Sequence, residues 1–173
     1  MKTAQALGIG VFLLGVSIVL AGGLGVPKKE DVPKYLNQLK TSQNAADRAK
    51  AAEMLGRRGG INVRDVADAV EPLKKALQKD IDAKVRAAAA RALGDIHTEP
   101  ETTVPILIER LKDDSKMDVK LAIVVALGQY GPDASAAVKP LREMLKKFDP
   151  KKSKEGQTIQ FSLQSITMKK KKG

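Results

Sequence analysis

The sequence predicts an all-α protein, a short α-solenoid of about four helical hairpins preceded by an N-terminal apolar helix. Aromatic residues make up only 3% of the 173 residues, whereas Ala occurs in runs such as Ala87 to Ala90. Small side chains of this kind suit close-packed helices better than a β-sandwich. A hydrophobic content of 43% is enough to form a core. The third observation is a motif that recurs four times along the chain.

The first element is an uncharged segment at the N-terminus. Residues Ala4 to Val26 carry no charge, and these 23 residues are long enough to span a bilayer. The stretch Leu7 to Ala21 also has the form of a signal peptide h-region, with a small-residue cleavage site at its end. Residues 1–27 are therefore predicted to be a signal peptide or a transmembrane anchor.

Membrane orientation stays open between two rules. The lysines that follow the segment favour a cytoplasmic body by the positive-inside rule. Signal-like architecture favours the opposite side, because such an N-terminus normally sets the direction early. We expect a membrane-anchored or exported protein, periplasmic or otherwise extracytoplasmic.

The repeats follow this segment. Each copy reads Val-Pro-x-Leu-x3-Leu-Lys-Asp, then a polar link, then Val-Arg-x-Ala-Ala-x-Ala-Leu-Gly-x-Ile. Equivalent positions are Gly56, Gly94, Gly128 and Gln164, which are 38, 34 and 36 residues apart. We predict repeats at about residues 30–60, 66–98, 101–132 and 135–167, within a solenoid domain of residues 28–168 that is followed by a basic tail, 169–173.

An apolar stripe with helical spacing marks the second helix of each repeat. In the second repeat it consists of Val85, Ala88, Ala89, Ala92, Leu93 and Ile96. Leu93 is therefore expected in the core. Lys74 is expected on the outer helix, where a change to Asp should be nearly neutral. Gly94 and Gly128 are expected where close packing or helix termination tolerates little side chain.

Helix starts are predicted from prolines and capping residues. The prolines expected in first helical turns, where a missing N–H matters least, are Pro72, Pro105 and Pro140. The expected N-caps of second helices are Asn44, Asp82 and Ser115. The last helix is expected from about Ile159 to Ile166, after a lysine-rich linker that runs from Phe148 to Gly156.

This pattern resembles the HEAT-like repeats first associated with the phycobilisome lyase family, over about residues 30–166. The resemblance implies a bacterial protein and a solenoid that binds another protein through its concave face. The activity in the family's name implies an alternative, a chromophore-lyase-like subunit or a chaperone of a tetrapyrrole protein. No aromatic cluster and no Cys supports a tetrapyrrole pocket.

Three cations occupy equivalent positions on successive second helices: Arg48, Arg86 and Lys120. By resemblance they would form a basic row on the concave face, with Arg91 nearby, and these four residues are the candidate binding site. The alternative is an internal ladder, in which each cation binds an Asp or a helix end of the adjacent repeat. The ladder is favoured, because arginines at such positions usually connect repeats and their stems can pack along apolar surface.

The positive charge is concentrated at the C-terminal end. The chain has a net charge of +11, but residues 139–173 carry 11 basic and 3 acidic groups, or +8, whereas residues 28–138 carry only +2. The candidate anion-binding lysines are Lys151, Lys152, Lys154, Lys169, Lys170, Lys171 and Lys172. They support a second alternative, binding of anionic lipid or nucleic acid. Nucleic acid is disfavoured, because the body is nearly neutral and has no Trp to stack on bases.

No catalytic or metal-binding constellation is visible. The chain has no Cys and one His, His97, which is expected at a helix end. The carboxylate pair Asp113 and Asp114 is expected to be solvated at a turn. We therefore predict no enzymatic activity, no cofactor and no metal.

Overall fold

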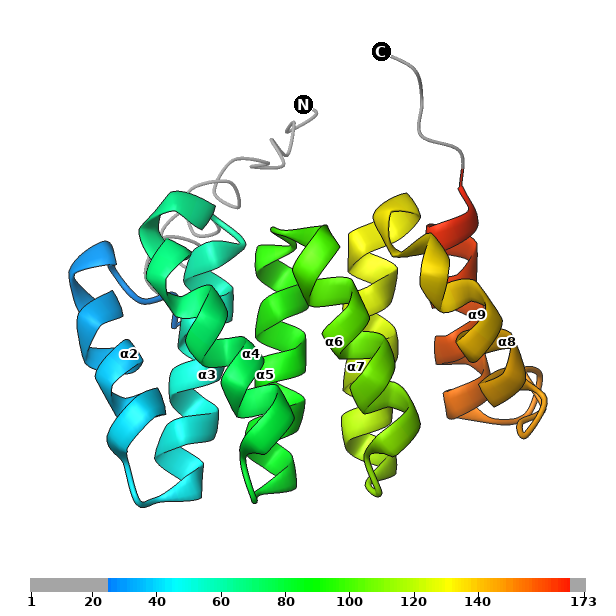
Figure 1. The fold of residues 1–173 in the computed structure, drawn as a ribbon, viewed down its shortest axis with the longest axis horizontal. Coiled ribbons are helices and arrows are strands. Elements are labelled where there is room, and N and C mark those ends of the chain that lie inside the picture. Colours follow the sequence, from blue (N-terminus) through cyan, green and yellow to red (C-terminus); the bar gives the residue numbers. More distant parts are fainter. Residues whose placement is uncertain (1–24, 169–173) are drawn as a thin grey trace, which may run out of the picture.

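The computed structural model describes residues 25–168, which fold into helical hairpins stacked side by side (Figure 1). The first helices of the hairpins are α2 (Val32–Thr41), α4 (Val70–Lys79), α6 (Pro100–Asp113) and α8 (Val138–Leu145). The second helices are α3 (Ala45–Gly59), α5 (Ala83–Ile96), α7 (Met117–Tyr130) and α9 (Lys154–Thr167). Short 3-10 segments, η1 (Lys29–Asp31), η2 (Val63–Ala69) and η3 (Gly131–Ala137), lead into α2, α4 and α8.

The predicted all-α solenoid of four hairpins is confirmed. No strand occurs in residues 25–168. The expected N-terminal apolar helix lies almost wholly outside the described residues, as does the basic tail. One helical stretch that the structure describes, Met117–Leu145, is long and apolar enough to pass a length-and-composition test for a membrane span. It comprises α7, η3 and α8, and its Ile123 and Leu141 are buried in the solenoid, so core packing accounts for its apolarity.

The second helices form the tighter of two layers. Each packs on the next, α3 on α5, α5 on α7 and α7 on α9, whereas successive first helices have few contacts and α6 and α8 barely touch. Closer packing on one side bends a stack toward that side, so the second helices lie on the inner side of the curve. We call their solvent-facing surface the inner face.

Glycines allow this close approach of second helices. A Cβ added at Gly56 would lie 2.6 Å from the Cα of Ala92, and one at Gly94 would lie 2.7 Å from the Cα of Ala126. Gly128 faces Ser162 of α9 in the same way. Close packing is thus the reason for Gly94 and Gly128, since both lie inside their helices.

Replacing Gly56 by Ala should lower the free energy of unfolding by about 1–3 kcal/mol, because the added methyl must separate α3 from α5. The matched control is Gly60→Ala at the end of the same helix, where the backbone already has φ −62° and a Cβ would meet no atom closer than 3.6 Å. That change should stabilise the protein by about 0.4–1 kcal/mol. Urea unfolding of both variants measures the difference, and equal effects would contradict the role assigned to Gly56.

The predicted core stripe is confirmed. Val85, Ala89, Ala92 and Leu93 are buried between neighbouring helices, and Ile96 is nearly so at the end of α5. Asn44 and Asp82 cap α3 and α5 as expected, since their side chains accept hydrogen bonds from the first backbone amides of each helix.

Three predictions about helix ends were wrong. Pro105 lies inside α6, because that helix begins at Pro100 and absorbs the segment that is 3-10 in neighbouring repeats. Ser115 does not cap α7; the carboxylate of Asp114 instead accepts a hydrogen bond from the amide of Lys116. The last helix begins at Lys154 rather than near Ile159, with Ser153 as its cap.

The prediction that Lys74 tolerates a change to Asp was also wrong. Lys74 is 2% exposed, and its Nζ lies 2.7 Å from Glu71, from Glu99 and from the Thr102 hydroxyl. Burial lowers the pKa of Lys74, but the bonds to both glutamates outweigh it and the net pKa is raised. An Asp at this position would add a third carboxylate to the group.

Lys74 also holds the turn between α5 and α6. Two non-glycine residues of that turn, His97 and Glu99, have left-handed φ values of 34° and 49°. Lys74 binds Glu99 from the preceding repeat, while the Tyr130 hydroxyl donates a 2.8 Å hydrogen bond to the Thr98 carbonyl from the same repeat's second helix. His97 is thus at a helix end, as expected, within a turn that is fixed from both sides.

Candidate functional site

Two of the predicted binding cations are used inside the solenoid. Arg48 on α3 reaches the next repeat, where its Nε and Nη2 donate to the two carboxylate oxygens of Asp80 at 2.7 and 2.9 Å. Its Nη1 donates to the carbonyls of Ser42 and Gln43 in its own repeat. One guanidinium therefore joins the turn of its own hairpin to the end of the next first helix.

Arg86 on α5 repeats this arrangement one interface later. Its Nε and Nη2 bind the oxygens of Asp114 at 2.7 and 3.0 Å, and its Nη1 binds the carbonyls of Asp80 and Ile81. Arg110 adds a 2.7 Å bond to Asp114 from the same side. The expectation that Asp114 is a solvated turn residue was wrong, because its side chain is fully buried between two guanidinium groups.

The electrostatics of these bidentate pairs favour their charged forms. Burial alone raises the pKa of the Asp114 carboxyl, but bonds from Arg86, the Lys116 amide and Arg110 outweigh it, so the pKa lies well below its usual range. The pKa of Asp80 is lowered in the same way by Arg48 and the Asp82 amide, against its burial. The hydrogen bond to each carboxylate raises the pKa of Arg48 and Arg86 despite their partial burial.

The favoured ladder is therefore present for Arg48 and Arg86, and neither side chain is free to bind a partner. The sequence analysis did not identify their partners, Asp80 and Asp114. A signal was available, because an Asp follows the first helix in both copies at the 34-residue step.

Lys120, the third predicted cation, has no carboxylate. Its Nζ donates a 3.0 Å bond to the carbonyl of Lys112, and it forms no ion pair with any residue that the structure describes. It lies at the start of α7, beside the first helix of the last repeat.

Arg91, the fourth candidate, lies on the inner face. Its side chain is exposed on α5, and within residues 25–168 it takes part in no hydrogen bond or ion pair. It borders two shallow hollows, one toward α3, which also involves Glu53, and one toward α7, which also involves Lys116 and Asp118. Of the four predicted cations, Arg91 is thus the one whose charge is available on this face.

The row that contains Arg91 becomes apolar toward the C-terminus. Its equivalents by the repeat spacing are Glu53, Val125 and Phe161. Val125 is 42% exposed and Phe161 is 71% exposed. Sequence reasoning missed this pair, although the spacing that aligns the glycines also aligns these positions. The inner face therefore offers charged groups at one end and two exposed apolar side chains at the other.

The C-terminal lysines do not form one cluster with this face. Lys151 and Lys152 are exposed in the turn between α8 and α9, where Lys152 lies 3.9 Å from Asp149. Lys154 is the first residue of α9 and not part of the linker. Lys169, Lys170, Lys171 and Lys172 lie outside the described residues. In the part of the chain that the structure covers, no three His, Asp or Glu side chains gather as a metal site would require.

The comparisons with known proteins agree with this architecture. The sequence profile described as HEAT repeats matches residues 32–127 and, in an overlapping second match, residues 70–154. Among curated proteins, no sequence matches the chain. The matched residues include α2 through the turn before α9, and so cover both Arg–Asp pairs and most of the inner face.

Proposed function

The chain belongs to the HEAT-repeat family, and on that premise we propose that it is a non-enzymatic scaffold that binds another protein through its inner face. HEAT solenoids present an extended surface of stacked helices, and proteins of this kind typically act as interaction scaffolds. The observation that carries the proposal is the row of Arg91, Val125 and Phe161, which is exposed although it lies on the tightly packed helices.

The chemistry of that row is typical of protein interfaces. Aromatic side chains and Arg are enriched among residues that dominate binding energy, and they act best near an apolar patch that excludes water. Phe161 supplies an aromatic anchor and Arg91 a guanidinium that no described residue engages. Glu53 provides an acidic group at the far end of the row, so the partner's surface should carry complementary charges.

We also propose that residues 1–27 attach the solenoid to a membrane or export it. The support is the uncharged stretch from Ala4 to Val26 behind a short basic start. N-terminal sequencing of the native protein tests this, since cleavage near Ala21 identifies a signal peptide and an intact Met1 identifies an anchor.

Photo-crosslinking should locate the partner on the inner face. A benzophenone amino acid placed at Phe161 or at Val125 in cells of the native source should give a covalent adduct with another protein. The matched control is the same residue at Glu109, which is exposed on the first helix α6. Phe161→Asp should lower the yield from position 125 at least about tenfold, because it places a carboxylate in the apolar patch.

Adducts from Glu109 in equal yield, or none from the inner face, would overturn the proposal. Phe161 is exposed, so the melting temperature of Phe161→Asp should stay close to that of the wild type. That measurement separates a lost interface from a lost fold.

A further inference from the structure

The series of Arg–Asp pairs is interrupted at the interface between the third and fourth repeats. Asp80 and Asp114 are 34 residues apart, and the same step leads to Phe148. The cation changes in parallel, since Arg48 and Arg86 are followed by Lys120. Lys120 thus occupies a carboxylate-binding position whose carboxylate is missing from the chain.

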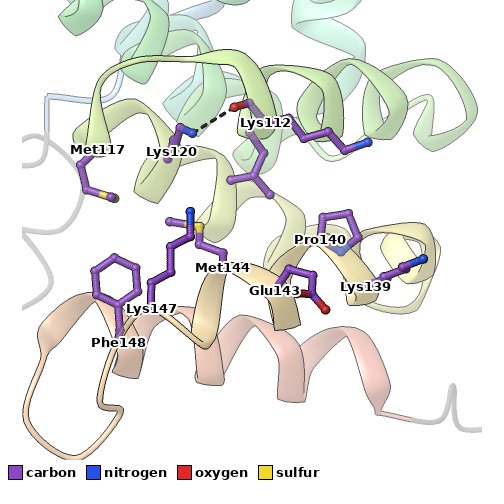
Figure 2. Close-up of a pocket in the computed structure, with 10 residues that line it drawn as sticks. Lys112, Met117, Lys120, Lys139, Pro140, Glu143, Met144, Lys147 and Phe148 are labelled. Atoms are coloured by element: carbon purple, nitrogen blue, oxygen red, sulfur yellow. Dashed lines mark hydrogen bonds between the residues drawn. The ribbon is translucent and has the colours of Figure 1, made fainter.

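A groove of about 530 Å³ lies beside Lys120, between the α6–α7 turn and α8 (Figure 2). It exists because α6 and α8 barely touch. Its apolar lining consists of Leu111, Met117, Pro140, Met144 and Phe148. Met117 is markedly exposed although its side chain is apolar.

The groove is strongly cationic. Four lysines line it, Lys112, Lys120, Lys139 and Lys147. Lys120 and Lys147 extend into it from opposite sides (Figure 2). The single acidic residue of the lining, Glu143, is bound at 2.9 and 3.0 Å by Lys146, which lies outside the groove. An anion here would therefore meet several ammonium groups and no competing free carboxylate from the lining.

The side-chain carboxylate that suits this position must come from another molecule. Residues 1–24 and 169–173, which the structure does not describe, contain no Asp or Glu. The two preceding interfaces show which chemistry the position accepts, because in each the ligand is an Asp side chain on a peptide segment. Phe148 also replaces that Asp with an apolar surface.

We propose that this groove binds an acidic peptide segment of a partner protein. An Asp or Glu carboxylate of the segment binds Lys120 and Lys147, and an adjacent apolar side chain packs on Met144 and Phe148. The inference rests on the proposed scaffold function but uses a different surface, since the groove lies between first helices and away from the inner face.

Fluorescence anisotropy with the full-length protein tests the site. The probes are a fluorescein-labelled peptide, Gly-Leu-Asp-Phe-Gly, and its Asn counterpart, Gly-Leu-Asn-Phe-Gly. We expect the Asp peptide to bind about tenfold more tightly at low salt, because the carboxylate adds a charge-assisted bond. Lys120→Met keeps an unbranched stem and removes the charge, so it should reduce this preference to less than about twofold.

A second variant rebuilds the missing pair. Lys120→Arg together with Phe148→Asp installs the residues of the two preceding interfaces, and should abolish preference for the Asp peptide without lowering the melting temperature. The control is Lys75→Met in the corresponding groove between α2 and α4, where Arg48 already binds Asp80. That change should leave peptide binding unaltered.

Equal binding of the two peptides, or an undiminished preference in Lys120→Met, would overturn the inference. So would binding of phosphatidylglycerol vesicles that Lys120→Met abolishes while neither peptide binds, since the groove would then be a lipid site. If peptide preference is absent but crosslinks from Phe161 persist, the groove inference fails and the scaffold proposal stands. If the crosslinks are absent and the peptide binds, the inner face is not the binding surface.

Discussion

Replacing Asp114 by Ala is expected to destabilise the solenoid by about 3–5 kcal/mol, because it leaves two partly buried guanidinium groups without a counter-charge. Arg86 and Arg110 both donate to this carboxylate, which also accepts from the Lys116 amide. The loss is comparable to the whole stability of a marginal domain. Urea unfolding followed by circular dichroism measures it.

The adjacent carboxylate provides the control. Asp113 is exposed, and Asp113→Ala should change the free energy of unfolding by less than about 0.5 kcal/mol. Similar losses in the two variants would contradict the assignment of the interface pair to Asp114.

The same pair predicts a pH dependence. The folded-state pKa of Asp114 is depressed, so the stability it contributes is complete above the unfolded-state value of about 3.9 and is lost as pH falls below it. The difference in unfolding free energy between the wild type and Asp114→Asn should therefore shrink between about pH 4 and pH 2. A difference that stays constant over this range would show that the charge of Asp114 does not matter.

Replacing Leu93 by Asp is expected to unfold the middle of the stack, with a loss of more than about 4 kcal/mol. Leu93 is buried on α5, which packs against both α3 and α7, so an unpaired carboxylate there disturbs two interfaces at once. The measurement is the melting temperature and helical circular dichroism of the variant.

Ile61→Asp is the control for Leu93→Asp. Ile61 follows α3 and is 63% exposed, so a carboxylate at this position remains hydrated. Its melting temperature should stay close to that of the wild type. If the two variants melt alike, the buried stripe of α5 has been assigned to the wrong residues.

The sequence by itself determined the fold class and the core. Apolar residues at helical spacing, in copies 34 to 38 residues apart, specify helices that must bury one face against a neighbour. Leu93 and Gly94 could therefore be placed correctly, because burial of a stripe and close approach at a glycine follow from periodicity alone. Asn44 and Asp82 followed equally from local capping chemistry.

The tertiary structure decided which charged residues are internal and which are free. Arg48, Arg86 and Arg91 lie on second helices with similar local sequences, yet the first two bind carboxylates 28 to 32 residues away and the third faces solvent. Lys74 was misplaced for the same reason, since its partner Glu99 comes from a turn in the next repeat. A charged side chain is stabilised by whatever group the fold brings within hydrogen-bonding distance. Periodicity describes one helix at a time, whereas these pairs depend on how neighbouring hairpins stack.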